Sequence, residues 1–144
     1  LTTDVIAGFC GETEEDHMLT LSLFREVCFD SAFMFAYSER PGTLAAKKYA
    51  DDVPYDVKVR RLNEIIALQG ECSLKSNRND VGKVFNVLVE GPSKKGDGQL
   101  CGRASNNKMC VFPDGGRRLR PGQYADVRVE DCTSATLICS LVQG

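Results

Sequence analysis

Few side chains in this sequence could do chemistry unaided. Its one histidine, His17, follows three acidic residues, and we expect it at the surface rather than in a catalytic site. The seven cysteines are an odd number and include no C-x-x-C pair, so the spacing typical of a zinc site is missing. Most of them lie among apolar residues, where a free cysteine behaves as a small buried side chain. The sequence therefore predicts reduced thiols and argues against a hydrolytic triad.

Two loops carry the candidate binding groups. VIAGF (residues 5–9) and SAFMFAY (residues 31–37) are short apolar runs, typical of strands buried on both faces of a parallel sheet. Ligands of such sheets bind beyond the carboxyl ends of the strands. In the loop after the second run, Arg40 offers a planar fork for a carboxylate or phosphate, and Thr43 adds a hydroxyl. The alternative is a capped turn whose arginine is a surface charge.

A helix must follow the first strand. Thr13 is placed as its N-cap, and Asp16 can complete a capping-box-like pair three residues later. Apolar residues then recur every four positions, which predicts a buried stripe along the helix. Leu19, Leu23 and Val27 have this spacing, and Leu21, Phe24 and Cys28 lie alongside them in the same stripe.

A second helix follows the second strand. Pro54 suits its first turn, with Asp52 or Val53 as the cap, and the apolar pattern continues to about Asn77. Residues 1–77 therefore have a β-α-β-α order, which is two consecutive units of a parallel α/β sheet.

The pattern changes to period two after residue 82. Five short strand-like runs separated by Gly-rich turns predict a small closed barrel. The runs are KVFNVLVE, QLCGRA, KMCVF, QYADVRVEDC and ATLICSLV.

Charge also divides the chain. Residues 1–73 hold 7 basic and 13 acidic residues, whereas residues 74–144 hold 11 and 7. A basic half could face a polyanion, although chance variation of surface charge is the simpler alternative. The overall composition, 42% hydrophobic and 26% charged, is ordinary for a globular protein, and no apolar run approaches the length of about 20 residues that spans a bilayer.

Six stretches, taken together, resemble a known family. In chain order they are TTDVIAGFCGETEEDH, FDSAFMFAYSERPGTLAA, RLNEIIALQ, SNRNDVGKVFNVLVEGPSK, GRASNNKMCVF and ATL. They resemble the C-terminal part of the radical S-adenosylmethionine (SAM) methylthiotransferases, most closely the MiaB type, which modifies tRNA. Because the chain starts without methionine and has only two βα units, we expect it to be a C-terminal fragment.

The resemblance implies an α/β plus all-β fold. Residues 1–77 would be the last two βα units of a partial (β/α) radical SAM barrel, and residues 78–144 a small five-stranded, OB-like TRAM barrel that binds RNA. The parent enzyme would use SAM and two 4Fe-4S clusters, one of them on a C-x-x-x-C-x-x-C motif that this sequence lacks. We therefore expect the fragment alone to be inactive and to hold none of these cofactors.

The same resemblance assigns roles to the loop residues. Ile6 and Gly8 would contact the adenine of SAM, and Glu12 would complete the motif at the end of the strand. Arg40 and Thr43 would face substrate or SAM. From the residues alone, the favoured interpretation is that Ile6 is a core side chain and Gly8 a packing glycine, and only the resemblance favours the binding role.

RNA binding would fall to the basic loops of the barrel. Backbone-led binding through phosphates is expected to be salt-sensitive. Phe85 and Phe112 are expected in the core, which leaves Tyr124, so we expect base stacking to be minor. The alternative is a solvated basic face. The candidate RNA-binding residues are Lys94, Lys95, Arg103, Lys108, Arg117, Arg118 and Arg120.

The resemblance predicts that the parent adds a methylthio group to C2 of an isopentenylated adenosine beside the anticodon. The expected partner is the anticodon stem-loop of tRNA, in the cytoplasm and away from membranes, and the oligomeric state is left open. One alternative is a RimO-type methylthiotransferase of a ribosomal protein, which Arg40 and Pro41 disfavour. The other is a non-catalytic RNA-binding module.

Overall fold

The chain is divided into two compact units. The computed structural model describes residues 1–94 and 96–143. The N-terminal unit is Leu1–Ser73 and the C-terminal unit is Leu74–Gly144. None of the helices in the described residues is long and apolar enough to cross a membrane.

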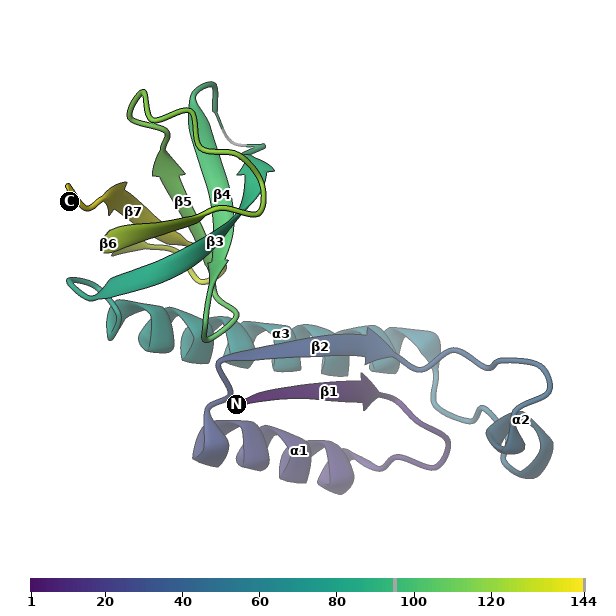
Figure 1. The fold of residues 1–144 in the computed structure, drawn as a ribbon. Helices are drawn as coiled ribbons and strands as arrows, with labels where there is room; N and C mark the ends of the chain where they lie inside the picture. The colour runs from purple at the N-terminus through teal and green to yellow at the C-terminus, as the bar shows by residue number, and fades with distance from the viewer. Residues whose placement is uncertain (95, 144) are drawn as a thin grey trace. The chain divides into compact units, whose positions relative to one another are not determined.

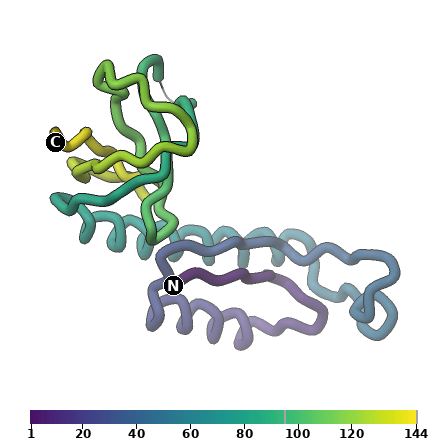
Figure 2. Tube along the Cα trace, in the orientation of Figure 1, coloured from purple at the N-terminus to yellow at the C-terminus, as the bar shows by residue number. Residues whose placement is uncertain are grey.

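The N-terminal unit is built on a two-stranded parallel sheet (Figures 1 and 2). The strands pair in register from Thr2 opposite Ser31 to Ala7 opposite Ala36. The β-α-β-α order predicted for this region is present, with one additional short helix. The elements are β1 (Thr2–Ala7), α1 (Glu14–Val27), β2 (Ser31–Ala36), α2 (Leu44–Lys48) and α3 (Tyr55–Arg78).

The two faces of this sheet have different surroundings. On one face, side chains such as Ala7 and Met34 pack with residues of α1 and α3 in a common apolar cluster. On the other face, Ile6, Phe33 and Phe35 are 52%, 68% and 57% exposed. The prediction that these strands are buried on both faces is therefore wrong for this chain, because only one face is covered by its helices.

Helix α1 begins as predicted but turns a different face to the core. Thr13 and Asp16 form a reciprocal capping box. However, Leu19 is 69% exposed, whereas His17 is 1% exposed and packs inward with Leu21. Leu21 and Phe24 of the predicted stripe are buried, which confirms that part of it, whereas Leu19, Leu23 and Val27 are exposed. The predicted surface position of His17 is wrong. The helix carries apolar side chains on more than one face, so its pattern alone did not identify the buried one.

Helix α3 occupies almost the predicted range. It starts directly after Pro54, but the two predicted caps have other partners. Asp52 Oδ1 accepts a hydrogen bond from the Gly11 backbone N–H (2.7 Å), and Val53 is buried. Both residues therefore hold the loop before α3 against the rest of the unit.

A disulfide joins Cys28 to Cys72, which lie 44 positions apart in the sequence. Cys28 caps the end of α1 in a left-handed conformation (φ 49°), and Cys72 lies on α3. The prediction of uniformly reduced thiols is wrong for this pair, because the packing of two helices brings together sulfurs that are distant in sequence.

The C-terminal unit is a closed barrel in the order β3-β4-β5-β7-β6, with β3 also paired to β6. All five predicted strands are present. Phe112 is in the core and Phe85 packs against it. Gly102 is needed on β4 because an added Cβ would lie 2.3 Å from the Leu88 carbonyl oxygen. The strands are β3 (Val84–Pro92), β4 (Gln99–Ala104), β5 (Met109–Pro113), β6 (Tyr124–Cys132) and β7 (Leu137–Leu141).

Candidate cofactor cavity and nucleic-acid surface

A cavity of about 740 Å³ lies over the open face of the β1–β2 sheet. Its floor is formed by side chains at every second position of the two strands, which point away from the helices. This period-two spacing is the sequence signal that could have identified them. Of the five predicted residues for SAM and substrate, Ile6, Arg40 and Thr43 line this cavity. The other lining residues are Asp4, Phe33, Phe35, Ala36, Tyr37, Ser38 and Ala45.

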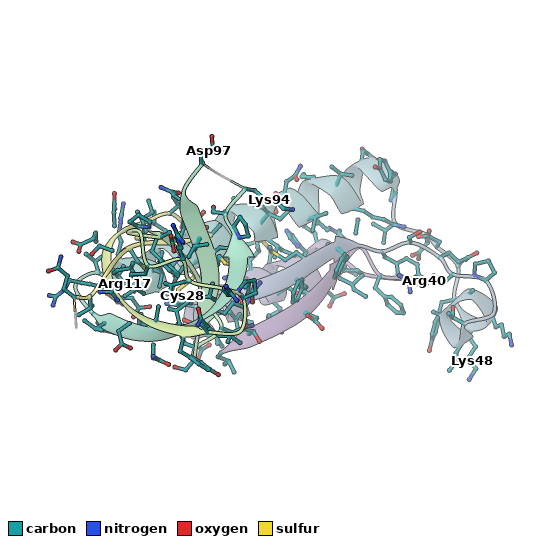
Figure 3. The ribbon with its side chains drawn as sticks, turned by 45° about the horizontal axis from the view of Figure 1, so that its top comes forward. Cys28, Arg40, Lys48, Lys94, Asp97 and Arg117 are labelled. Atoms are coloured by element: carbon teal, nitrogen blue, oxygen red, sulfur yellow. A yellow bond between two sulfur atoms is a disulfide. The ribbon has the colours of Figure 1, made fainter. Side chains whose placement is uncertain are left out.

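The loop that carries Arg40 is fixed by Thr43. The Thr43 hydroxyl donates to the Arg40 carbonyl oxygen (2.8 Å) and accepts from the Ala46 backbone N–H (3.3 Å), which makes Thr43 the N-cap of α2. Arg40 is exposed in the segment between β2 and α2 (Figure 3). The Thr43 hydroxyl, which was predicted to contact a ligand, therefore stabilises the loop and the start of α2. Arg40 is the cationic side chain of the loop that remains exposed.

Gly8 and Glu12 are not among the residues that line the cavity. The Gly8 backbone N–H donates to Glu12 Oε1 (3.0 Å), which closes the turn after β1. Gly8 has a positive φ of 76°, and an added Cβ would lie 2.3 Å from Cγ of Lys58. The absence of a side chain at Gly8 is thus required by Lys58, and Lys58 Nζ in turn donates to the Tyr37 carbonyl oxygen (3.3 Å).

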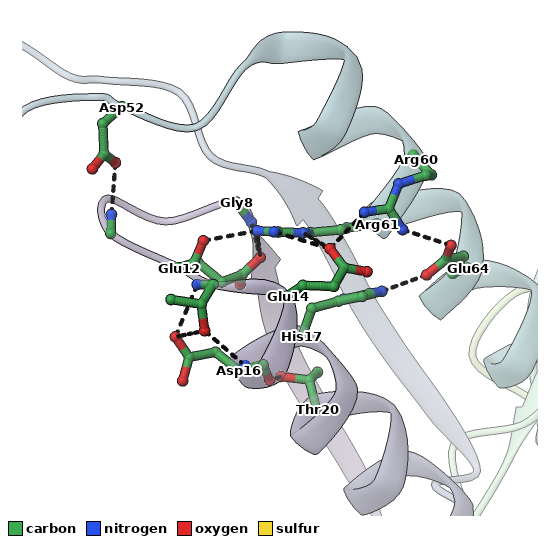
Figure 4. A network of polar contacts seen from close by, with 12 residues as sticks. Gly8, Glu12, Glu14, Asp16, His17, Thr20, Asp52, Arg60, Arg61 and Glu64 are labelled. Carbon is green, nitrogen blue, oxygen red and sulfur yellow. Dashed lines mark hydrogen bonds and ion pairs between the residues drawn. The ribbon is translucent and has the colours of Figure 1, made fainter.

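Two arginines of α3 organise the same turn (Figure 4). Arg61, which is 5% exposed, donates to Glu12 Oε1 (2.8 Å) and to Glu14 Oε2 (3.1 Å). Arg60 donates to Glu14 (2.6 Å) and to Glu64 (2.8 Å). Apart from Arg60 and Glu64, which are four positions apart on α3, the partners are more than 40 positions apart, and the sequence alone did not predict this network.

The network lowers the pKa of two of its carboxyl groups, those of Glu14 and Glu64. The hydrogen bond from Arg60 and the further bond from Arg61 hold the pKa of Glu14 below its ordinary value. The pKa of Glu64 is lowered by the His17 ring and then by Arg60. These carboxylates are therefore charged at neutral pH and engaged by arginine, so their role is to fix α1 and the turn after β1 against α3.

The predicted RNA-binding residues do not form one cluster. Lys94 and the three arginines 117, 118 and 120 lie in the β3–β4 and β5–β6 loops, which are joined by the bond from Asp114 N–H to the Gly98 carbonyl oxygen (3.0 Å). Figure 3 labels Lys94 and Arg117. Lys95 lies outside the described residues. We call the set Lys94, Arg117, Arg118 and Arg120 the basic rim.

Arg103 and Lys108 flank the β4–β5 turn, at the opposite ends of the strands from the basic rim. Lys108 is largely withdrawn from solvent, because its Nζ donates to Ser76 Oγ (2.8 Å) and to Asp80 Oδ2 (2.5 Å). Burial acts to raise the pKa of Asp80, but hydrogen bonds from Lys108 and Lys83 more than offset it, so this pKa is lowered. Lys108 therefore fastens the end of α3 to the barrel and is poorly placed to bind phosphate.

The comparisons with known proteins identify the barrel. Residues 78–142 match the family described as the TRAM domain. The C-terminal unit is a TRAM domain. The match to this family begins at the last residue of α3 and includes all five barrel strands.

Relatives align with the TRAM domain and the N-terminal unit together. The chain is 56% identical over 137 residues to the tRNA-2-methylthio-N(6)-dimethylallyladenosine synthases of Phocaeicola vulgatus and Bacteroides thetaiotaomicron, which covers 95% of this chain. It is 52% identical to the same enzyme of Porphyromonas gingivalis over 99% of its length. The chain spans about 30% of the length of each of these relatives. These matches confirm the predicted relationship to the MiaB-type methylthiotransferases.

Similarity to solved structures is weak. A multidomain protein with nucleic acid binding domains from Streptococcus pneumoniae aligns with a TM-score of 0.36 at 20% identity, over 45% of this chain and 24% of that one. RNase R of Mycoplasma genitalium aligns with a TM-score of 0.41 at 12% identity, over 68% and 19%. Neither alignment is close enough to support an argument about the TRAM domain or the cavity.

Proposed function

We propose that this chain forms the C-terminal part of a tRNA-2-methylthio-N(6)-dimethylallyladenosine synthase. The parent would add a methylthio group to C2 of an isopentenylated adenosine beside the anticodon. The observation that carries this proposal is the identity of 52–56% to synthases of that name over 95% or more of the chain. In our proposal the radical SAM part is residues 1–77, the TRAM part is residues 78–144, and the enzyme acts in the cytoplasm.

The cavity on the open sheet face fits one part of SAM. Ile6, Phe33 and Phe35 offer an exposed apolar floor for a flat adenine ring, and Asp4 and Arg40 add one charge of each sign to the lining. When bound, SAM would supply the methyl group and, on reductive cleavage by a cluster, the radical that abstracts hydrogen. The sequence has no C-x-x-x-C-x-x-C motif, so any such cluster would be held by residues outside this chain.

Each predicted cofactor residue then has a distinct task. Ile6 would contact the adenine directly. Gly8 and Glu12 would act as positioning residues, because their hydrogen bond closes the turn at the end of the strand that carries Ile6. Arg40 would hold an anionic group of substrate or SAM, with Thr43 fixing its loop.

The TRAM domain would hold the anticodon stem-loop of the tRNA. The exposed cations of the basic rim suit phosphate oxygens, whereas Lys108 is engaged by Asp80. For binding of this kind, the logarithm of the affinity falls linearly with the logarithm of the salt concentration. The names of the relatives, together with Arg40 and the basic rim, favour tRNA over a ribosomal protein as the substrate.

A chimeric enzyme tests this function. The matching C-terminal segment of the Bacteroides thetaiotaomicron relative would be replaced by this chain and expressed in a host lacking its own synthase. We expect 2-methylthio-modified adenosine in tRNA by liquid chromatography and mass spectrometry. Unmodified tRNA from a folded, cluster-loaded chimera would contradict the proposal.

Two variants of the chimera separate the cavity from general stability. Ile6→Asp places a charge on the apolar floor and should abolish SAM cleavage. Lys75→Asp, at an exposed position of α3 outside the cavity, should retain it. Equal SAM cleavage by the Ile6→Asp chimera and the unsubstituted chimera would remove Ile6 from the proposed site.

A further inference from the structure

Tyr124 is an exposed aromatic side chain at the first residue of β6. It is 64% exposed, and the next residue, Ala125, is buried in the barrel, so strand alternation directs Tyr124 outward. Within residues 1–94 and 96–143, its side chain makes no hydrogen bond, ring contact or cation–π contact. Its ring is therefore available to a ligand.

Strand pairing gives Tyr124 an apolar neighbour and a cationic one. Tyr124 lies opposite Leu88 on β3, and Leu88 lies opposite Arg103 on β4. Leu88 is 37% exposed and faces outward, because its neighbours Val87 and Val89 are fully buried and side chains alternate along a strand. Because neighbouring strands are about 4.8 Å apart, this outward row spans about 10 Å.

The guanidinium of Arg103 is held in place at one end of the row. Its Nη1 donates to the Asn107 carbonyl oxygen (3.0 Å), and its Nε lies 3.3 Å from Glu90 Oε1. Glu90 is itself exposed, so the pair leaves part of the guanidinium fork accessible to a phosphate.

The turn before Tyr124 places a second arginine near the other end. The Arg120 backbone N–H donates to Gln123 Oε1 (2.8 Å). Gln123 and Gly122 are hydrogen-bonded to Val89 of β3 at 2.8 and 2.9 Å. This turn is thereby fixed to the strand that carries Leu88, and the side chain of Arg120, a member of the basic rim, is exposed beside it.

We infer that Tyr124 and Leu88 form a stacking platform for an unpaired nucleobase of single-stranded RNA, with Arg103 and Arg120 contacting the adjacent phosphates. This inference rests on the proposed RNA binding and adds a base contact to it. It differs from the sequence-based expectation that base stacking would be minor. A flat apolar surface between two cations suits a nucleotide, because every base offers a ring face regardless of its sequence.

A tryptophan reporter gives the direct test. The chain contains no tryptophan, so Tyr124→Trp introduces a single fluorophore at the platform. We expect its fluorescence to be quenched by a short single-stranded oligoribonucleotide, and to be unchanged by an abasic oligomer of the same length and charge. Tyr55→Trp is the matched control, since Tyr55 is 78% exposed on α3 and should report no base-dependent quenching. Equal quenching of the Tyr124→Trp protein by both oligomers would overturn the inference.

Affinities then separate stacking from charge. Tyr124→Ala should weaken binding of the base-bearing oligomer by about 5- to 150-fold and leave the abasic oligomer unaffected, whereas Tyr124→Phe should retain affinity. Arg120→Ala should weaken both oligomers and reduce the slope of log affinity against log salt by about 0.7.

The two proposals fail in different ways. Equal affinity of the unsubstituted chain for both oligomers, or equal losses for both in Tyr124→Ala, would overturn the stacking platform and leave phosphate binding intact. No binding of either oligomer at low salt would overturn both the platform and the proposed RNA binding.

Discussion

The N-terminal and C-terminal units bury apolar side chains in different ways. The closed barrel places Phe112, Val127 and Leu137 at 1% exposure or less. The open two-stranded sheet leaves Phe33 and Phe35 more than half exposed on one face. Closure pairs every strand on both sides, whereas an open sheet needs a further layer to cover its second face. The barrel interior is thus committed to stability, and the open sheet face is available for a ligand.

The sharpest test of this comparison replaces one phenylalanine in each unit with alanine. Phe112→Ala should lower the free energy of unfolding by about 3–5 kcal/mol, because it leaves a cavity in a packed core. Phe33→Ala removes an exposed ring and should change it by about 0.5 kcal/mol or less. Urea unfolding followed by circular dichroism measures both. Similar losses from the two variants would break the comparison.

The polar contacts of the C-terminal unit predict a pH-dependent effect. Lys108→Met removes a hydrogen bond between charged groups from buried Asp80, which should cost about 1.5–3 kcal/mol at pH 7. The pKa of Asp80 lies below its ordinary 3.8, so this stabilisation is present above about pH 4 and is lost as pH falls through the folded-state pKa.

Urea unfolding at a series of pH values checks this. The unsubstituted chain and Lys108→Met should differ at pH 7 and converge in acid. Lys75→Met, at an exposed position of α3, should match the unsubstituted chain throughout. A difference that persists unchanged below pH 3 would assign the effect to packing of the lysine stem instead.

Two glycines of the N-terminal unit should differ although their backbones are alike. Gly8 and Gly11 have φ of 76° and 78°, so alanine is strained at both. Only at Gly8 would the new Cβ collide with Lys58, whereas nothing lies within 4 Å at Gly11. Gly8→Ala should therefore destabilise the unit by about 1–3 kcal/mol more than Gly11→Ala. Thermal unfolding of the two variants measures the difference, and equal effects would show that Lys58 can move aside.

The smallest expected effect concerns the start of α1. Thr13→Ala removes the capping hydroxyl and should cost about 1 kcal/mol. Thr20→Ala, in the same helix but past its first turn, should instead stabilise slightly, because alanine is the better helix former. Opposite signs in urea unfolding would support a role for the cap beyond helix propensity; the same sign for both variants would argue against it.

Much of the local structure and the family followed from the sequence. The change from helical to period-two patterning located the barrel and all five of its strands, and Thr13 with Asp16 marked a helix start. These features depend on contacts within a few residues or within one strand pair. The likeness of long co-linear stretches identified the methylthiotransferase family, and it directed attention to Ile6 and Arg40, which line one cavity.

Only the tertiary structure decided which surfaces are buried and which cations are free. Leu19 is exposed and His17 is buried, the reverse of the prediction, because α1 has apolar side chains on two faces and only one of these faces packs against the sheet. The disulfide between Cys28 and Cys72 and the hydrogen bond from Arg61 to Glu12 join residues that are more than 40 positions apart. The predicted RNA-binding residues do not lie together, because the β4–β5 turn is at the opposite ends of the strands from the basic rim. In addition, Lys108 is hydrogen-bonded to Asp80 near the end of α3. Contacts between distant segments depend on the whole fold, and residue type and spacing do not determine them.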